Sequence, residues 1–251
     1  MNINCANIAV AGESNIGTGR SHNEDNFLII DRPGDEAVLC AIADGIGGHG
    51  NGEIASRICI KELLRAAWTK PGREWDDKFL LDALRSANRR IFERNFAERR
   101  RRPMGCTVIA AIFFRDHIIF AFAGDSRLYV YDPANEHHFR QLSTDHRPGI
   151  KEGRNHHGLK DEFSNFVCRS LGTQKYVDVE CKISDRPAQA RYLMCSDGLY
   201  SVTPEPLLLN ALSSTMTVRQ ITGNLMREAL LAGARDNVSL ICAGAQEMEH
   251  L

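Results

Sequence analysis

The sequence predicts an α+β protein with mainly antiparallel sheets, and three observations lead to this prediction. Short apolar runs rich in Val, Ile and Phe are typical of strands. The spacing of the runs over residues 108–131 fits hairpins, which indicates antiparallel pairing. The predicted helices come in pairs, whereas a doubly wound parallel sheet would place one helix after every strand.

The first part of the chain is expected to form two strands, at residues 27–30 and 37–43, and then two helices. The first helix is predicted over 52–68, with Asn51 as a candidate cap. The second is predicted over 77–96, because apolar residues between Phe79 and Ile91 fall on one face of a helix.

The second part is expected to begin with strands and to end with a second helix pair and one last strand. Thr203 and Pro204 are typical of a cap followed by proline in the first helical turn. Residues 217–220 form a capping box that opens an amphipathic run to Leu231. The strands are predicted at 108–114, 118–123, 127–131, 177–183, 191–195 and 237–242.

Length and charge limit the classes of protein that the chain could represent. With 251 residues the chain fits one large domain or two small ones, and its net charge of −1 gives no sign of a nucleic-acid or membrane-surface partner. It has no apolar run that approaches a membrane span, and its N-terminus lacks the basic flank of a signal peptide. A cytoplasmic protein without a membrane span is therefore expected.

The eight cysteines are scattered along the chain and form no C-x-x-C pair. Several lie inside apolar runs, so buried reduced thiols are expected rather than a zinc site or a set of disulfides. None is preceded by His and followed closely by Arg, as the nucleophile of a tyrosine phosphatase would be.

Carboxylates stand where predicted strands begin or end. An isolated acid at such a place is often only a turn former. Several acids gathered together would repel one another and have raised pKa values, and a hard divalent cation would remove that conflict. Oxygen-only ligation favours magnesium, manganese or calcium over zinc. The acids are Glu24, Asp25, Asp44, Asp125, Asp197 and Asp236.

A competing interpretation concerns residues 45–50, which satisfy the dinucleotide-binding pattern G-x-G-x-x-G between a predicted strand and a predicted helix. The rest of that unit is missing. About 20 residues further on, where a second strand should end in a ribose-binding acid, the chain is still helical around Arg65. Asp44 would also place a negative charge close to a pyrophosphate.

Eight motifs in a fixed order make the chain resemble the metal-dependent protein phosphatases of the protein phosphatase 2C type, in their compact bacterial form. The resemblance covers nearly the whole chain and implies a single domain over 1–251, with a flap-like segment at about 146–168. It also implies a four-layer αββα sandwich, in which two mainly antiparallel sheets are flanked by pairs of helices. The motifs are RSHNED (20–25), ADGIGGH (43–49) with AS (55–56), GCT (105–107), GDSR (124–127), DH (145–146), RSLG (169–172), CSDG (195–198) and DN (236–237).

The resemblance implies roles for the acids at two tightly held Mn²⁺ or Mg²⁺ ions. Asp44 would bridge the two cations, and Asp197 and Asp236 would complete the first site. Glu24 and the carbonyl of Gly45 would serve the second site, partly through water.

Three further roles follow from the same resemblance. Asp25 would lie near the second cation, Asp125 would help Asp197 to hold a weaker third cation, and Arg20 would bind the substrate phosphate. The cations would share a water for direct attack on phosphoserine or phosphothreonine, without a covalent phosphoenzyme. The protein would act on phosphorylated proteins as a monomer, opposing a bacterial serine/threonine kinase.

The chain departs from the commonest family pattern at several places. Ile46 stands where many eukaryotic relatives have a His, so His49 either takes part in catalysis or hydrogen-bonds the loop backbone. The segment over 146–165 is also shorter than the usual flap. A catalytically inactive relative that acts as a binding module is a second interpretation, although such proteins usually lack metal ligands and every expected acid is present here.

Overall fold

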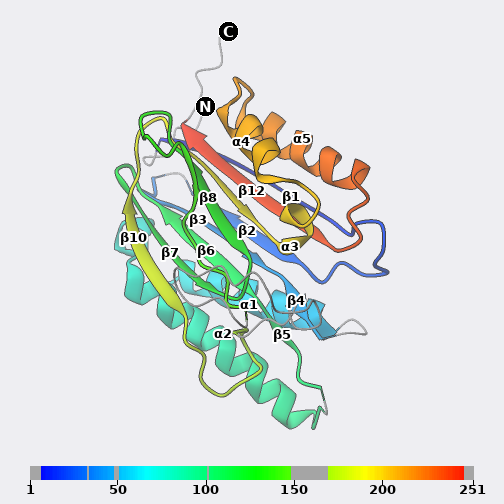
Figure 1. Cartoon of the computed structure of the whole chain (residues 1–251). Helices are drawn as coiled ribbons and strands as arrows, with labels where there is room; N and C mark the ends of the chain where they lie inside the picture. Colours follow the sequence, from blue (N-terminus) through cyan, green and yellow to red (C-terminus); the bar gives the residue numbers. More distant parts are fainter. Residues whose placement is uncertain (1–6, 33, 48–50, 101, 148–168, 246–251) are drawn as a thin grey trace.

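Two antiparallel β-sheets lie face to face, and helices cover the outer face of each (Figure 1). The computed structural model describes residues 7–32, 34–47, 51–100, 102–147 and 169–245. Sheet 1 has the strand order β1-β12-β11-β8-β9, and sheet 2 has the order β10-β7-β6-β3-β2. A small third sheet pairs β4 with β5.

The strands of sheet 1 are β1 (Ile8–Asn15), β8 (Arg127–Tyr131), β9 (Phe139–Gln141), β11 (Arg191–Cys195) and β12 (Val238–Ala245). Those of sheet 2 are β2 (Asn26–Ile30), β3 (Val38–Ala43), β6 (Val108–Phe113), β7 (His117–Ala123) and β10 (Glu180–Asp185). The short strands are β4 (Gly45–Ile46) and β5 (Gly105–Cys106). The helices are α1 (Asn51–Ala67), α2 (Asp77–Ala97), α3 (Asp197–Tyr200), α4 (Glu205–Ser213) and α5 (Val218–Leu231), with one 3₁₀ turn over Gly72–Glu74.

The side chains of β3 alternate between two cores, because successive residues of a strand point to opposite faces of its sheet. Leu39 and Ala41 pack in one hydrophobic cluster with residues of α1 and α2. Cys40 and Ile42 pack in another cluster, together with residues of sheet 1. The centre of sheet 2, at β3 and β6, is therefore buried on both faces.

Strand β12 shows the same alternation in sheet 1. Ile241 and Ala243 face the cluster between the sheets, whereas Leu240 and Cys242 face α4 and α5. The layers are therefore a helix pair, sheet 2, sheet 1 and a second group of helices. This confirms the four-layer sandwich that the resemblance implied.

Most predicted elements are present, with differences at their ends. Helix α1 begins at Asn51, one residue earlier than expected, and β10 lies about three residues later than the strand predicted at 177–183. The capping box of α5 is confirmed, because the Gln220 amide donates to Thr217 Oγ1 at 3.2 Å and the Thr217 amide donates to Gln220 Oε1 at 2.9 Å.

The predicted start of α4 was wrong. Pro204 holds the cap position without a side-chain hydrogen bond, and α4 begins at Glu205. Thr203 is buried, and in the described structure its hydroxyl has no hydrogen-bond partner. Pro204 has an extended backbone conformation, with φ −60° and ψ 148°, so the helix begins one residue later than the sequence pattern indicated.

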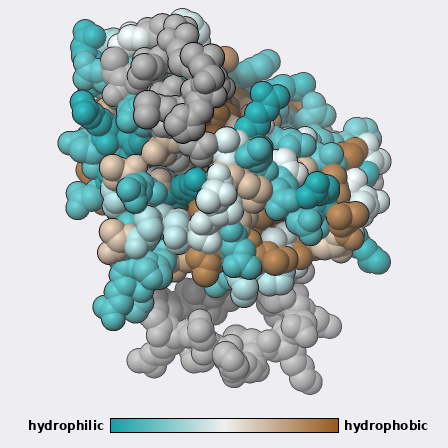
Figure 2. Space-filling view, turned by 90° about the horizontal axis from the view of Figure 1, so that it is seen from above, coloured by the Kyte–Doolittle hydropathy of each residue, from teal (hydrophilic) through white to brown (hydrophobic). Residues whose placement is uncertain are grey.

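The surface seen from above mixes hydrophilic residues with small separate groups of hydrophobic ones (Figure 2). None of the helices in the described ranges is long and apolar enough to cross a lipid bilayer.

Candidate active site

Chain direction brings four of the predicted acids to one edge of sheet 2. Strands β3 and β7 run the same way, because each pairs antiparallel with β6, and β2 runs the opposite way. Asp44 follows β3, Asp125 follows β7, and Glu24 and Asp25 precede β2. All four therefore lie at the same edge.

Sheet 1 contributes its functional residues at the adjoining edge. Asp197 follows β11 and begins α3, while Asp236 precedes β12, which pairs antiparallel with β11. Strand β1 ends beside the beginning of β12, with Asn15 opposite Val238, and the loop after β1 carries Arg20. The candidate site thus lies between the sheets and belongs to both.

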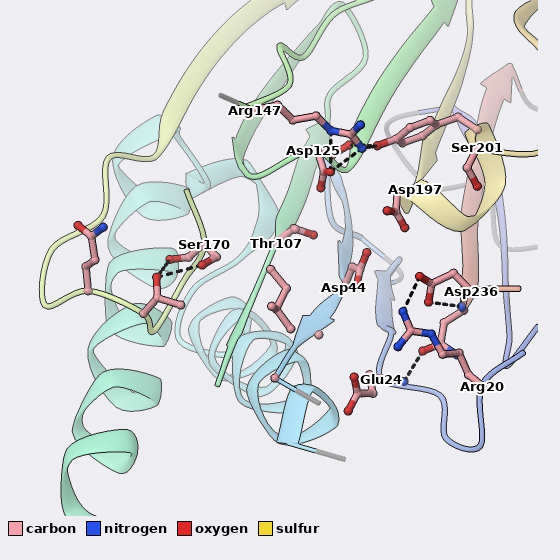
Figure 3. A pocket seen from close by; sticks show the side chains of 17 residues that line it. Arg20, Glu24, Asp44, Thr107, Asp125, Arg147, Ser170, Asp197, Ser201 and Asp236 are labelled. Atoms are coloured by element: carbon pink, nitrogen blue, oxygen red, sulfur yellow. Dashed lines mark hydrogen bonds and ion pairs between the residues drawn. The ribbon is translucent and has the colours of Figure 1, made fainter. Parts of the chain in front are cut away.

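A cavity of about 1080 Å³ opens at this shared edge. Six of the seven predicted side chains, together with the backbone of Gly45, point into it or line it (Figure 3). Asp25 is the exception: it is only 5% exposed and is not among the residues that line the cavity. The lining residues predicted from the sequence are Arg20, Glu24, Asp44, Gly45, Asp125, Asp197 and Asp236.

Glycine at position 45 is required by a close approach of three segments. A Cβ atom on Gly45 would lie 2.6 Å from the backbone oxygen of Glu24 and would also collide with the backbone of Gly52. This contact sets the first turn of α1 against Glu24, whose Oε1 accepts a 3.3 Å hydrogen bond from the Gly52 amide. Ser56 Oγ donates to the Glu24 carbonyl at 2.5 Å and fixes the other side.

Asn237 ties the loop that carries Arg20 and Glu24 to the start of β12. Its Oδ1 accepts a 2.8 Å hydrogen bond from the Glu24 amide. Its Nδ2 donates to the carbonyls of Ile16 and His22, at 2.8 and 3.0 Å. Asn237 belongs to a motif that the sequence singled out, and the structure shows that its side chain positions the loop.

The acids raise one another's pKa values. Burial raises the pKa of Asp44 well above its ordinary value, and the charges of Asp25, Asp197 and Asp125 add to the effect. Burial and then the charge of Asp125 raise the pKa of Asp197 to about 7. The repulsion expected from the sequence is therefore present, and a bound cation would relieve it.

Asp25 provides the test of whether a cation fits. Burial raises its pKa to about 6, although Ser196 Oγ donates a 2.8 Å hydrogen bond to its Oδ2. Its Oδ1 is buried and has no hydrogen-bond partner in the described structure. A buried, unsatisfied carboxylate oxygen in an all-oxygen site fits a hard divalent cation or one of its waters.

The acids stand around the cavity in an open arrangement. Within the described ranges, no three Asp, Glu, His or Cys side chains are already gathered closely enough to enclose an ion. Two of the acids are instead paired with arginines: Asp236 with Arg20, and Asp125 with Arg147. Cation binding would therefore draw the carboxylates together and rearrange these ion pairs.

Arg20 lies at the rim of the cavity. Its Nη2 donates to Asp236 Oδ2 at 2.7 Å, and its side chain is 51% exposed. The hydrogen bond to Asp236 is the chief cause of its raised pKa, and the charges of Glu24 and Asp44 contribute. A charged, forked guanidinium at the mouth of an acidic cavity can bind a phosphate bidentately.

The sequence did not single out Arg147 or Tyr200, yet both line the cavity. Arg147 falls at the start of the flap-like segment expected at about 146–168, and no pattern in the sequence marked it as functional. The opposite wall includes Ser170, which is held in place because the neighbouring Leu171 exchanges two backbone hydrogen bonds with Cys106. His49 and residues 148–168 of the expected flap lie outside the described residues.

Comparisons with known proteins agree with this geometry. The family model of protein phosphatase 2C matches residues 11–233. A serine/threonine phosphatase, stp, from Listeria monocytogenes serotype 4b (strain F2365) is 29% identical over 235 residues, which cover 88% of this chain and 90% of that protein. The serine/threonine protein phosphatase PstP of Mycobacterium tuberculosis is 30% identical over 244 residues, which cover 96% of this chain and 45% of that protein.

Among solved structures, the catalytic domain of PstP in complex with two manganese ions superposes with a TM-score of 0.81. The sequences are 29% identical, and the match covers 96% of this chain and 99% of that one. The arrangement of the layers is thus shared with that structure.

Proposed function

Because the chain belongs to the protein phosphatase 2C family and is a serine/threonine phosphatase of the bacterial type, we propose that its clustered acids hold two Mn²⁺ or Mg²⁺ ions. The observation that carries the proposal is the convergence of acids from both sheets on one cavity, with raised pKa values. When bound, such a cation pair lowers the pKa of a water, and its positive charge stabilises the phosphoryl oxygens.

The positions of the acids support a division of labour. Asp44, which follows β3, would bind both cations. Asp197 and Asp236, from the edge of sheet 1, complete one site. Glu24 and the carbonyl of Gly45, from the edge of sheet 2, serve the other.

Asp25 is buried and accepts a hydrogen bond from Ser196, so near the second cation it would orient a ligand rather than face the substrate. Asp125 stands beside Asp197 and is the candidate ligand of a weaker third cation. Arg20 would hold the phosphate at the mouth of the cavity, where its half-exposed guanidinium pairs with Asp236 as long as no cation occupies that carboxylate.

The cysteines support water as the nucleophile. Burial raises the pKa of Cys195 to about 12 and that of Cys106 well above its ordinary value, so both thiols stay protonated at neutral pH. Of the six cysteines in the described residues, five are buried and Cys181 is half-buried. A cysteine-based covalent route therefore has little support.

The substrates are phosphorylated proteins. We further propose that the chain acts as a monomeric single domain over 1–251 in the cytoplasm and opposes a serine/threonine kinase. The names of the bacterial relatives support a role in phosphorylation signalling.

The test is release of phosphate from a phosphothreonine peptide by protein that has been treated with chelator and dialysed. We expect no turnover without added metal and recovery with Mn²⁺ or Mg²⁺. A protein that binds the phosphopeptide but never releases phosphate would instead be the inactive binding module. Full activity in excess chelator would exclude the metal-dependent mechanism.

A further inference from the structure

Arg147 and Asp125 form an ion pair inside the catalytic cavity. Arg147 Nε and Nη2 both donate to Asp125 Oδ2, at 3.0 and 2.8 Å (Figure 3). The Asp125 side chain is only 5% exposed, and that of Arg147 is 21% exposed. A carboxylate as buried as this one needs a positive partner, and in the described structure an arginine of the chain itself fills that role.

Tyr200 holds the pair in place from the side of α3. Its hydroxyl accepts a 2.8 Å hydrogen bond from Arg147 Nη2 and donates to the backbone carbonyl of Asp125 at 3.0 Å. The guanidinium of Arg127 stacks on the Tyr200 ring, with its central carbon 3.6 Å from the ring centre. Arg147 is thus oriented by two neighbours rather than by Asp125 alone.

The backbone of Arg147 is tied to the turn that carries Asp125. The amide of the preceding residue, His146, donates to the Gly124 carbonyl at 2.9 Å. In return, the Gly124 amide lies 3.1 Å from His146 Nδ1, which accepts the hydrogen bond. Release of Asp125 by Arg147 is therefore a movement of one side chain and does not require the backbone to shift.

Arg147 occupies Oδ2 of Asp125, so a divalent cation that binds both carboxylate oxygens has to displace the guanidinium, and one that binds Oδ1 alone still faces its positive charge. Two positive groups cannot share one carboxylate oxygen at close range without strong repulsion. The Asp125 charge also acts on its neighbours, since it raises the pKa values of Asp197 and Asp44. Whatever neutralises Asp125 therefore changes the electrostatics of the whole cavity.

We propose that Arg147 is a built-in counter-cation of Asp125 that competes with a third divalent cation, so that the third site fills only at concentrations high enough to displace the guanidinium. This inference rests on the proposed two-cation site. Arg147 would thereby set the metal concentration at which the third site fills. At low metal concentration the enzyme works with two bound cations, and Arg147 neutralises Asp125.

The test is a calorimetric Mn²⁺ titration of cation-free wild-type protein and of the Arg147→Gln variant. Both proteins should bind two ions tightly, and the third ion should bind at least about tenfold more tightly to the variant. Adding Asp125→Asn to Arg147→Gln should remove the third ion and keep the tight pair. The matched control is Arg219→Gln, which removes the same charge from the exposed face of α5 and should leave all three affinities unchanged.

An unchanged third affinity in a folded Arg147→Gln protein would overturn the proposal, and so would loss of the tight pair. If the wild-type protein has no tight pair, the proposed function fails and this inference fails with it. A tight pair with an unaltered third site overturns this inference alone.

A second measurement needs only the wild-type protein. The Arg147 Nε–H group should be protected from solvent exchange by its hydrogen bond to Asp125, and it should give a distinct nitrogen-15 NMR signal, assigned by its loss in Arg147→Lys. Titration with diamagnetic Mg²⁺ should remove this protection at the concentration that fills the third site. Protection that persists through saturation would show that guanidinium and cation do not compete.

Discussion

The guanidinium of Arg20 donates a 2.7 Å hydrogen bond to the carboxylate of Asp236, from the loop after β1 to the residue that precedes β12. The pair joins the group proposed to bind phosphate to a group proposed to bind a cation. Both side chains are substantially exposed, at 51% and 40%, so the pair contributes little to stability and can exchange partners. A cation at Asp236 would free the Arg20 N–H groups for the substrate.

Replacement of Arg20 by Ala should raise KM for a phosphopeptide more than it lowers kcat. The reason is that Arg20 would bind the phosphate similarly in the ground state and in the transition state. Steady-state kinetics at saturating Mn²⁺ would check this, and the KM of Arg20→Lys is expected to fall between those of the wild-type protein and Arg20→Ala. Arg219→Ala is the control for loss of one charge, and a pure kcat defect in Arg20→Ala would give Arg20 a different role.

Asp44→Asn should lower turnover by more than about a hundredfold. Changes to groups that only support a metal ligand already cost about 10–100-fold, and Asp44 is expected to contact both cations. Asp197→Asn should behave in the same way. Asp82→Asn, at an exposed position of α2, is the matched control and should be fully active. Near-normal turnover of a folded Asp197→Asn protein, checked by circular dichroism, would contradict the assignment.

Asp125→Ala should separate cation binding from catalysis. The two tight ions should remain, because the central ligands are untouched, while turnover should fall with the loss of the third site. Calorimetric titration and kinetics on the same preparation would measure both. Full activity would make Asp125 a turn residue, and loss of the tight ions would place it in the central pair.

The cation-free protein should become less stable as the pH rises from about 4 to about 7. Asp25 and Asp197 have ordinary pKa values of 3.8, which the fold raises to about 6 and about 7. Over this range the folded chain holds protons that the unfolded chain has lost, so the free energy of unfolding is largest at low pH and falls as these groups ionise. The melting temperature should drop by roughly several degrees, since each pKa unit is worth about 1.4 kcal/mol.

Thermal unfolding in chelator at each pH would test this dependence. Saturating Mn²⁺ should abolish most of it, because the cations compensate the ionised carboxylates. Asp25→Asn should flatten the profile of the cation-free protein. A profile that rises with pH in chelator, or one that Asp25→Asn leaves unchanged, would mean that these carboxyls are not held protonated by the fold.

The sequence predicted the elements that have strong local patterns. Strand β3 has a continuous apolar run that ends at Asp44, and the capping box marks the start of α5. Strand β1 was missed, because its small residues between Ile8 and Asn15 show little of the Val, Ile and Phe enrichment on which the prediction relied. It is stabilised by pairing with β12, far away in the chain, which no local pattern reveals.

The acids of the site were predictable because they stand at strand ends in a familiar order, and the structure brings them to one edge. Arg147 was not, because its function depends on the distance to Asp125, which lies 22 residues earlier in the chain. The shape of the Glu24 loop likewise depends on Asn237, more than two hundred residues away. Long-range hydrogen bonds of this kind leave no periodic trace in the sequence.

The place of β12 in sheet 1 has a consequence for synthesis on the ribosome. Strand β12 lies between β1 and β11, and Ile8 pairs opposite Ala245. Strand β1 is therefore made early but cannot join its sheet until residues 238–245 have emerged from the exit tunnel. Until then the backbone N–H and C=O groups of β1 stay unpaired, and a chaperone can shield this segment. Asp236, the proposed cation ligand, also arrives late, so the nascent chain should be unable to hydrolyse phosphate before β12 is in place.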